Sequence, residues 1–282
     1  MLANEMFLDS ASLRSSVVSH AKTLGYEVQS ARSPIATVNV ALTTTNSSKT
    51  MPAGTAFSTT VDDVSYQFVT IADATATNAG GFVTFNNVKI YEGTYITTKY
   101  IVDTSNPEQR FLLPDSRSDT STLKVQVQNS ASDSTVATYT KATDISQISS
   151  TSSVYYLQEV ENGRHEVYFG DGNVSKALSD GNIVILNYVV TNKTASNGAS
   201  TFSAPSTIDG VSDITVTTVS NAGGGAEPES LASIKLQAPL DYASQGRAVT
   251  TDDYITYTKK LFANTQAVSV WGGEDGGFDP AT

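Results

Sequence analysis

The dipeptide Asn162-Gly163 constrains this chain most, because it stands between two runs rich in aromatic and β-branched residues, Val154–Val160 and His165–Phe169. A type I′ turn requires positive φ at both central residues, which Asn and Gly adopt at little cost. We therefore expect a hairpin with a two-residue turn. After a polar segment, the run Ile183–Val190 is apolar enough to predict a buried strand.

Further β-rich segments lie on both sides of this hairpin. Pro52 presets φ for a turn and Gly54 supplies a positive φ, so a strand is expected directly after them. The other expected strands cover residues 36–42, 64–71, 82–91, 94–102, 109–113, 122–128, 135–141 and 214–219.

Residues 9–24 predict an amphipathic helix, with Asp9 as the N-cap and Leu8 and Leu13 as a hydrophobic staple. Gly25 can adopt the left-handed conformation that ends a helix. Two placements of this helix remain open. It packs on another chain or a missing segment, or it covers one side of the sheet that follows.

The C-terminal part changes from strands to helices after a hinge or linker at Asn221–Ala226. Pro228 suits the first turn of a helix, which Pro239 is expected to end. Residues 266–271 predict a later strand. This unfinished α/β pattern predicts that the native protein continues past Thr282.

A second C-terminal helix is expected to begin after Thr250. Thr250 is a good N-cap, Asp253 stands at the third helical position of a capping box, and Val249 and Tyr254 would form a staple.

The predicted fold class is α+β, mainly β, with β-sandwich or barrel-like modules, an N-terminal helix and a C-terminal α/β part, in a truncated chain. The expected divisions are a helical segment (1–30), a β scaffold (31–102 with 182–220), an inserted β subdomain (103–181), the Gly-rich hinge (221–226) and an incomplete α/β domain (227–282).

Composition excludes several classes of protein. The 282 residues include no Cys, so disulfides and Cys-ligated metal sites are ruled out. The net charge of −11, from 17 basic and 28 acidic residues, argues against a nucleic-acid-binding surface, which needs clustered Lys and Arg. No apolar run reaches the ~18 residues of a membrane helix, and the acidic N-terminus does not match a signal peptide.

Side chains that could carry chemistry are sparse. The two histidines, His20 and His165, are too far apart in sequence for the paired spacing of a zinc site. No Ser lies in a nucleophile-elbow setting, so a hydrolytic triad has little support. We predict no catalytic residue, no metal site and no cofactor, and interpret both histidines as surface or partly buried side chains.

Carboxylates allow two further hypotheses, both of which we set below a structural interpretation. A calcium loop beginning at Asp171 would need Glu at its twelfth position, which holds Asn182. A glycosidase pair could come from Glu159, Glu161, Glu166 and Asp171, but nothing places one of them in an apolar pocket that would raise its pKa.

Three other patterns have ordinary interpretations. Gly223-Gly224-Gly225 lacks the Gly-Lys-Ser/Thr ending of a phosphate loop, and Lys259-Lys260 suit the negative end of a helix. The aromatic residues of the hairpin and the following strand either pack between strands or face a protein partner; they are Tyr155, Tyr156, Tyr168, Phe169 and Tyr188.

Four blocks in a fixed order carry a family resemblance. They are SLRSSVVSHAKTLGY, PAGTAF, the hairpin with YFGDG followed by NGAS, and a C-terminal block of GAEPESLASIKLQAP, SQGRAVTTDDY and VWGGED. Together they resemble the baseplate J-like family, and within it the gene-product-six type of wedge protein from T-even-type contractile-tailed phages. The family pattern also includes an upstream helical region and a further C-terminal part.

The resemblance implies a structural protein of the virion tail baseplate, assembled in the host cytoplasm. It implies that copies dimerise and join neighbouring wedges into a ring around the hub, next to other wedge and sheath-initiating proteins, and that this ring changes geometry on tail contraction. No nucleic acid or membrane is expected as a partner.

The residues we expect at subunit contacts lie on predicted helices; they are Leu13, Val17, Leu24, Arg247, Tyr254, Tyr257 and Leu261. The alternative function is a receptor-binding or adhesin-like β protein of a tail fibre or cell surface. The helical C-terminal block separates the two hypotheses, because adhesin repeats do not need one.

Overall fold

The computed structural model describes residues 2–106, 108–143, 148–262, 265 and 267–272. The chain divides into two compact units. The β unit is Ser30–Glu227, and the helical unit combines Met1–Gln29 with Pro228–Thr282. The predicted class, α+β and mainly β with an N-terminal helix, is confirmed.

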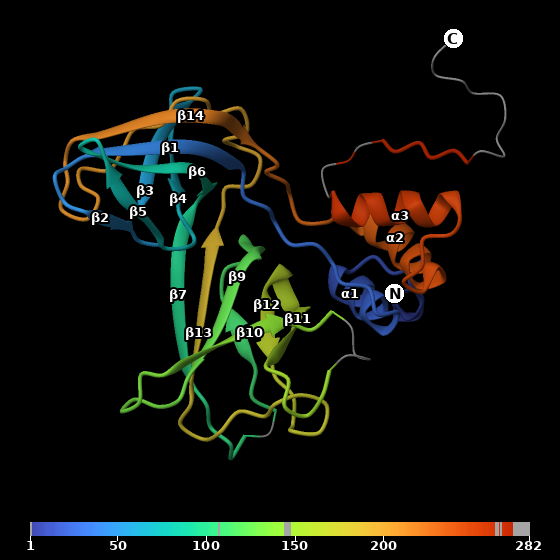
Figure 1. Ribbon diagram of the computed structural model, residues 1–282. Coiled ribbons are helices and arrows are strands. Elements are labelled where there is room, and N and C mark those ends of the chain that lie inside the picture. The colour runs from blue at the N-terminus through green and yellow to red at the C-terminus, as the bar shows by residue number, and fades with distance from the viewer. Residues whose placement is uncertain (1, 107, 144–147, 263–264, 266, 273–282) are drawn as a thin grey trace, which may run out of the picture. The chain divides into compact units, whose positions relative to one another are not determined.

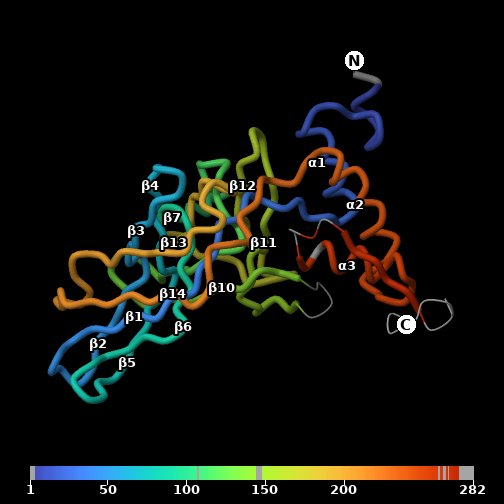
Figure 2. Tube along the Cα trace, turned by 90° about the horizontal axis from the view of Figure 1, so that it is seen from above, coloured from blue at the N-terminus to red at the C-terminus, as the bar shows by residue number. Residues whose placement is uncertain are grey.

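The first sheet of the β unit has the strand order β14-β1-β6-β4-β3, and β5 pairs with both β6 and β2 (Figures 1 and 2). Its strands are β1 (Ile35–Thr43), β2 (Ser48–Met51), β3 (Ala56–Val61), β4 (Val64–Val69), β5 (Ala74–Ala79), β6 (Phe82–Glu92) and β14 (Ile214–Gly223). Strand β1 alternates as predicted, with Val38, Val40 and Leu42 fully buried. Strands β2 and β5 were not predicted, because neither contains more than one large apolar residue.

The second sheet has the order β7-β13-β9-β10-β11-β12-β8. Its strands are β7 (Thr94–Ile101), β8 (Phe111–Leu113), β9 (Ser118–Gln128), β10 (Val136–Lys141), β11 (Val154–Glu159), β12 (His165–Tyr168) and β13 (Ile183–Val190). Strand β13 lies between β7 and β9, and its buried character is confirmed.

The hairpin formed by β11 and β12 is confirmed, with one difference in its turn. Asn162 and Gly163 both have positive φ, at 61° and 70°. The turn is a short 3₁₀ segment, Glu161–Gly163, closed by a bond from the Val160 N–H to the Arg164 carbonyl oxygen (2.7 Å). It is therefore one residue longer than predicted.

The segment expected to be a hinge is instead part of the β unit. Strand β14 extends to Gly223, and Ala226 forms a bridge with Arg32. A Cβ atom on Gly225 would collide with the Lys193 carbonyl oxygen and the Pro34 ring. Gly225 is therefore required for close packing, and this packing does not favour a hinge at residues 221–226.

The helical unit contains a 3₁₀ turn (Leu2–Met6), α1 (Arg14–Thr23), α2 (Leu231–Ser244) and α3 (Thr251–Leu261). Helix α1 begins later than predicted, and Asp9 is not its N-cap. The carboxylate of Glu5 instead accepts hydrogen bonds from the N–H groups of Ser12 (2.9 Å) and Leu13 (3.2 Å). The buried face of α1 packs against α2, so it covers neither a sheet nor, on that face, another chain.

The predictions for the C-terminal helices have different outcomes. Helix α2 begins after its N-cap Ser230, so Pro228 lies before the first turn and not in it. Pro239 lies inside α2 instead of ending it. Burial of Ile234 and Ala238 against α1 offsets part of the ~3 kcal/mol that an interior proline costs a helix. The capping box of Thr250 and Asp253 is confirmed. Val249 is 76% exposed and Tyr254 49%, so the structure gives no support for the staple.

The strand expected at residues 266–271 does not form in its described part, 267–271, and Gln266 lies outside the described residues. The described C-terminal part is therefore helical and not α/β.

Candidate functional site

The chain passes from the first sheet to the second through a single residue, Gly93. Glu92 ends β6, where it pairs with Phe68, and Thr94 begins β7, where it pairs with Val190. Gly93 has φ of 124°, and a Cβ atom there would collide with the Val190 carbonyl oxygen. Only glycine fits this bend, which brings β6 and β13 into contact.

Glu92 is fully buried at this bend, and its carboxylate is well bonded. It accepts hydrogen bonds from the Thr191 hydroxyl (2.7 Å), the Asn192 N–H (2.8 Å) and the Asn192 side-chain amide (2.8 Å). These donors follow β13, so the carboxylate joins the end of β6 to the segment that leaves the second sheet. Buried carboxylates are tolerated only with such partners.

Asp119 makes a second buried connection. It is 1% exposed, and it accepts hydrogen bonds from the Ser33 N–H (2.8 Å) and from the Ser121 N–H (3.0 Å) and hydroxyl (2.6 Å). Ser33 precedes β1 and Asp119 lies near the start of β9, so this carboxylate also joins the two sheets. We call Ser33, Glu92, Gly93, Asp119, Thr191 and Asn192 the inter-sheet junction.

The junction divides the β unit differently from the sequence-based domains. Both β7 and β13 belong to the second sheet, although they were placed in the scaffold at 31–102 with 182–220. The hydrogen bonds of the junction connect the two sheets within one compact unit.

The histidines lie in different units. His20 Nε2 is 2.8 Å from the Glu5 carbonyl oxygen, and His165 is buried in β12. Within the described ranges, no three His, Asp or Glu side chains are grouped closely enough to hold a metal ion. No helix in that part of the chain has the length and apolar character to cross a membrane.

The candidate carboxylates take part in local structure. Asp171 accepts a hydrogen bond from the Asn173 N–H (2.9 Å), which is the main cause of its lowered pKa. Glu166 bonds to Gln158 and lies 3.9 Å from the Arg110 guanidinium. These contacts fit the turn and strand interpretations.

The aromatic residues of the hairpin face both sides of the sheet. Tyr155 and Tyr188 are in the core. Tyr156 and Tyr168 stack with ring centroids 5.2 Å apart, and the Arg110 guanidinium lies 5.0 Å from the Tyr168 ring centroid. Part of this set is therefore core and part forms a separate stacked pair, as the period of two requires.

Exposed apolar side chains are concentrated on the helical unit. Of the 18 large hydrophobic side chains that are exposed within the described residues, 7 belong to the β unit and 11 to the much smaller helical unit. The 11 are Met6, Phe7, Leu13, Leu236, Leu240, Tyr242, Val249, Tyr254, Leu261, Phe262 and Trp271. We call them the apolar helical surface.

The predicted contact residues fall into two groups. Leu13 (56% exposed), Tyr254 (49%) and Leu261 (68%) belong to the apolar helical surface, and Arg247 is also exposed. Val17 is fully buried between α1 and α2, while Leu24 and Tyr257 are half-buried. Val17 therefore stabilises the helical unit itself, and the other residues remain candidates for subunit contacts.

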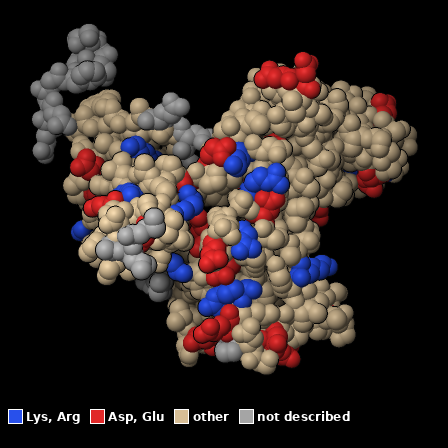
Figure 3. All heavy atoms as spheres, turned by 180° about the vertical axis from the view of Figure 1, so that it is seen from behind, with Lys and Arg blue, Asp and Glu red and all other residues tan. Residues whose placement is uncertain are grey.

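Sequence reasoning missed most of this surface. Leu236 and Leu240 are four residues apart on α2, away from the buried Ile234 and Ala238. That second apolar spacing was the signal that could have revealed it. On the face in Figure 3, Lys and Arg are interspersed with Asp and Glu and form no basic patch.

The chain is similar to bacteriophage baseplate wedge proteins. A family model described as the third domain of the bacteriophage baseplate wedge protein gp6 matches residues 95–203, which run from the second residue of β7 past the end of β13. The chain is also 29% identical to the baseplate wedge protein gp6 of Enterobacteria phage T4 over 95% of its own length. It spans 44% of that relative, which is less than half.

Proposed function

We propose that the chain is a baseplate wedge protein of the gp6 type and a structural part of a phage tail baseplate, located in the virion; its similarity to the third domain of gp6 and to the gp6 of phage T4 supports this. In this proposal the apolar helical surface binds neighbouring subunits. The concentration of 11 of the 18 exposed hydrophobic side chains on the helical unit carries this proposal.

The physical basis is the size and kind of the exposed side chains. Burying one Leu, Phe or Met side chain contributes about 1.5–3 kcal/mol. Several of them together offset the ~4–15 kcal/mol that association costs in lost motion. Aromatic residues and Met are enriched in interfaces, and Phe7, Tyr254 and Trp271 belong to this surface.

The partners we propose are other copies of the chain and other wedge and sheath-initiating proteins, joined in a ring around the hub. Contraction then changes the geometry at the interfaces between subunits. Residues 221–226 are packed into the β unit, so the moving element in this proposal is an interface and not a hinge in this segment.

The test compares the wild-type chain with two double variants by size-exclusion chromatography with light scattering. Each protein is measured alone and mixed with the other wedge proteins of the same phage. Tyr254→Asp with Leu261→Asp should abolish the larger species. The matched control, Val64→Asp with Val219→Asp, changes side chains of the β unit that are 51% and 50% exposed and should keep it.

Equal assembly by both double variants would overturn the proposed surface. A wild-type chain that forms no complex with any wedge protein but responds on a glycan array would support the receptor-binding alternative.

A further inference from the structure

Strand β7 has a free edge. It forms a ladder with β13 and with no other strand of the described residues, and β4 lies beside its first residues only. The Val102 N–H donates to the Asn182 carbonyl oxygen (2.8 Å). Since hydrogen-bonded pairs alternate along an antiparallel ladder, the backbone N–H and C=O groups of the even-numbered residues of β7 point towards β13. The N–H and C=O groups of Tyr95, Thr97 and Lys99 therefore point away from the sheet.

Contacts at both ends of β7 confirm this direction. The Gly93 N–H donates to the Gln67 carbonyl oxygen (2.8 Å), and the Ile101 carbonyl oxygen accepts from the Gln109 side-chain amide (3.0 Å). Both groups are on the outward side. Between them, no backbone bond from this edge to any described residue is present, and Figure 1 shows β7 as the outer strand of its sheet.

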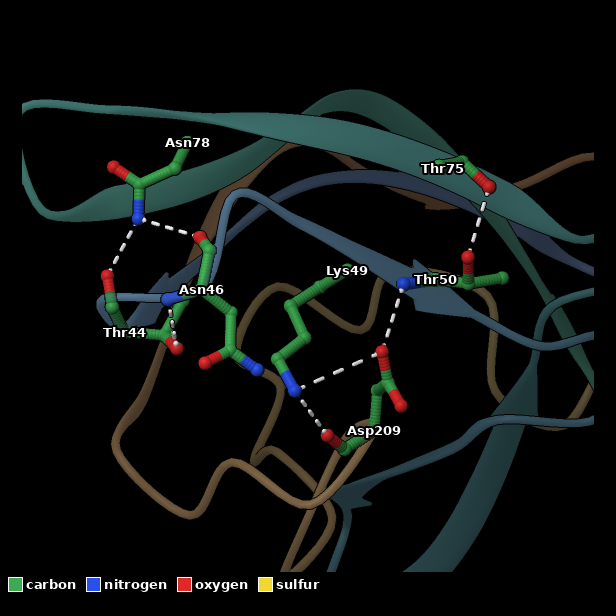
Figure 4. Close-up of polar contacts among 7 residues, drawn as sticks. All are labelled: Thr44, Asn46, Lys49, Thr50, Thr75, Asn78 and Asp209. Carbon is green, nitrogen blue, oxygen red and sulfur yellow. Dashed lines mark hydrogen bonds and ion pairs between the residues drawn. The ribbon is translucent and has the colours of Figure 1, made fainter.

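Two outer strands of the first sheet, β2 and β3, differ from β7 because other segments of the chain bond to their edges. The Thr50 N–H of β2 donates to the Asp209 carboxylate (3.1 Å), which also lies 3.9 Å from Lys49 Nζ (Figure 4). Ser58 of β3 exchanges two backbone bonds with Ser203 (3.1 and 2.8 Å). Exposed edges are normally blocked in this way, and residues Tyr95–Lys99 of β7 have no such backbone cover from the described residues.

The opposite edge of the second sheet limits what can bind. The Tyr100 hydroxyl of β7 donates to the Leu112 carbonyl oxygen of β8 (2.6 Å). A tyrosine side chain together with this bond is longer than the ~4.8 Å that separates paired strands. The edge strands β7 and β8 are therefore near each other but too far apart to pair. A second copy of β7 would bring its own β13 against β8, whereas a single extended segment brings no further strand.

We propose that residues Tyr95–Lys99 bind an extended segment of a partner protein as an added strand. The segment supplies backbone groups to Tyr95, Thr97 and Lys99. Its apolar side chains cover the half-buried Ile96 and Tyr100 on the core face. On the solvent face it places an Asp or Glu opposite the exposed Lys99, as cross-strand pairs of opposite charge favour. This site is independent of the apolar helical surface.

The probe is a synthetic six-residue peptide, acetyl-Thr-Val-Glu-Val-Thr-Val-amide, titrated against the whole chain by isothermal calorimetry. The variant Thr97→Pro removes the outward N–H and keeps the ladder with β13, which proline tolerates on an edge. Thr97→Val is the matched control, because both variants lose the bond from the Thr97 hydroxyl to Asn187 (2.7 Å) but only proline loses the N–H.

We expect the wild-type chain and Thr97→Val to bind alike, and Thr97→Pro to bind at least about tenfold more weakly. A peptide N-methylated at alternate amides should also bind at least about tenfold more weakly to the wild-type chain, which decides the matter if Thr97→Pro fails to fold. Lys99→Glu should reverse the preference towards a peptide with Lys in place of Glu.

Equal affinity of Thr97→Pro and Thr97→Val would overturn the proposal. So would equal affinity of the N-methylated and unmodified peptides, or the absence of any binding at millimolar peptide. A dimer of the wild-type chain that Thr97→Pro dissociates would show that the edge binds a second copy instead.

Discussion

At the scale of single residues, Glu92 has the largest structural consequence, because its buried carboxylate meets three donors. Glu92→Gln keeps the shape but turns an N–H₂ group towards donors. We expect a loss of about 2–4 kcal/mol in the free energy of unfolding, measured by urea denaturation. The control is Glu227→Gln, whose exposed carboxylate pairs with Lys193 at 2.5 Å and which should cost less than ~1 kcal/mol. Equal losses of unfolding free energy in the two variants would show that the buried carboxylate of Glu92 contributes no more than a surface one.

Glu5 makes a prediction about pH. Its pKa is lowered from 4.5 to about 2, chiefly by the hydrogen bond from the Ser12 N–H. Since the folded pKa is below the unfolded one, this stabilisation is complete above pH 4.5 and is lost as the pH falls towards 2. Glu5→Gln should therefore flatten stability against pH in that range, followed by circular dichroism. The exposed Glu108→Gln should leave the curve unchanged, and an unchanged curve for Glu5→Gln would refute the capping role.

Local residue patterns predicted the features that depend only on neighbouring residues, such as turns and helix caps. Asn162-Gly163 gave the two positive φ values, and Thr250 with Asp253 gave the capping box. Glu92 and Asp119 escaped prediction, because their partners Thr191 and Ser33 are 99 and 86 residues away in sequence. Nothing near a lone carboxylate in a strand indicates where its donors will come from.

At the scale of elements, strands were predicted better than the ends of helices. Alternation located β1 and a continuous apolar run located β13, because the side chains that form these patterns also form the core. Helix α1 was placed too early, since the group that caps it comes from Glu5 and not from the sequence next to its first turn. Helix α2 continues past Pro239 because its packing on α1 offsets the local cost of the proline. That packing depends on residues far away in sequence, so the local pattern did not reveal it.

The packed segment before α2 can be tested with two neighbouring glycines. Gly225→Ala places a Cβ against the Lys193 carbonyl oxygen and Pro34, and should lower the free energy of unfolding by more than about 2 kcal/mol. Gly223→Ala meets nothing within 4 Å and should be neutral or stabilising by up to ~1 kcal/mol. Thermal and urea unfolding of both variants would check this. Two neutral substitutions would restore the hinge interpretation.

At the scale of the whole molecule, stability and assembly should be separable. Tyr254 and Leu261 are exposed, so Tyr254→Asp with Leu261→Asp should change the free energy of unfolding by less than about 1 kcal/mol. Val17→Asp buries a charge between α1 and α2 and should unfold the helical unit. Differential scanning calorimetry distinguishes the two results. A large loss of stability in the double variant would mean that these side chains support the fold.

Tail assembly in an infected cell tests the central claim most directly. A phage that lacks its own copy of the protein is supplied with the full-length protein carrying either Tyr254→Asp with Leu261→Asp or the control Val64→Asp with Val219→Asp, and tails are counted by electron microscopy. The account predicts normal tails with the control and tails without complete baseplates with the helical variant. Normal tails with both variants would contradict it.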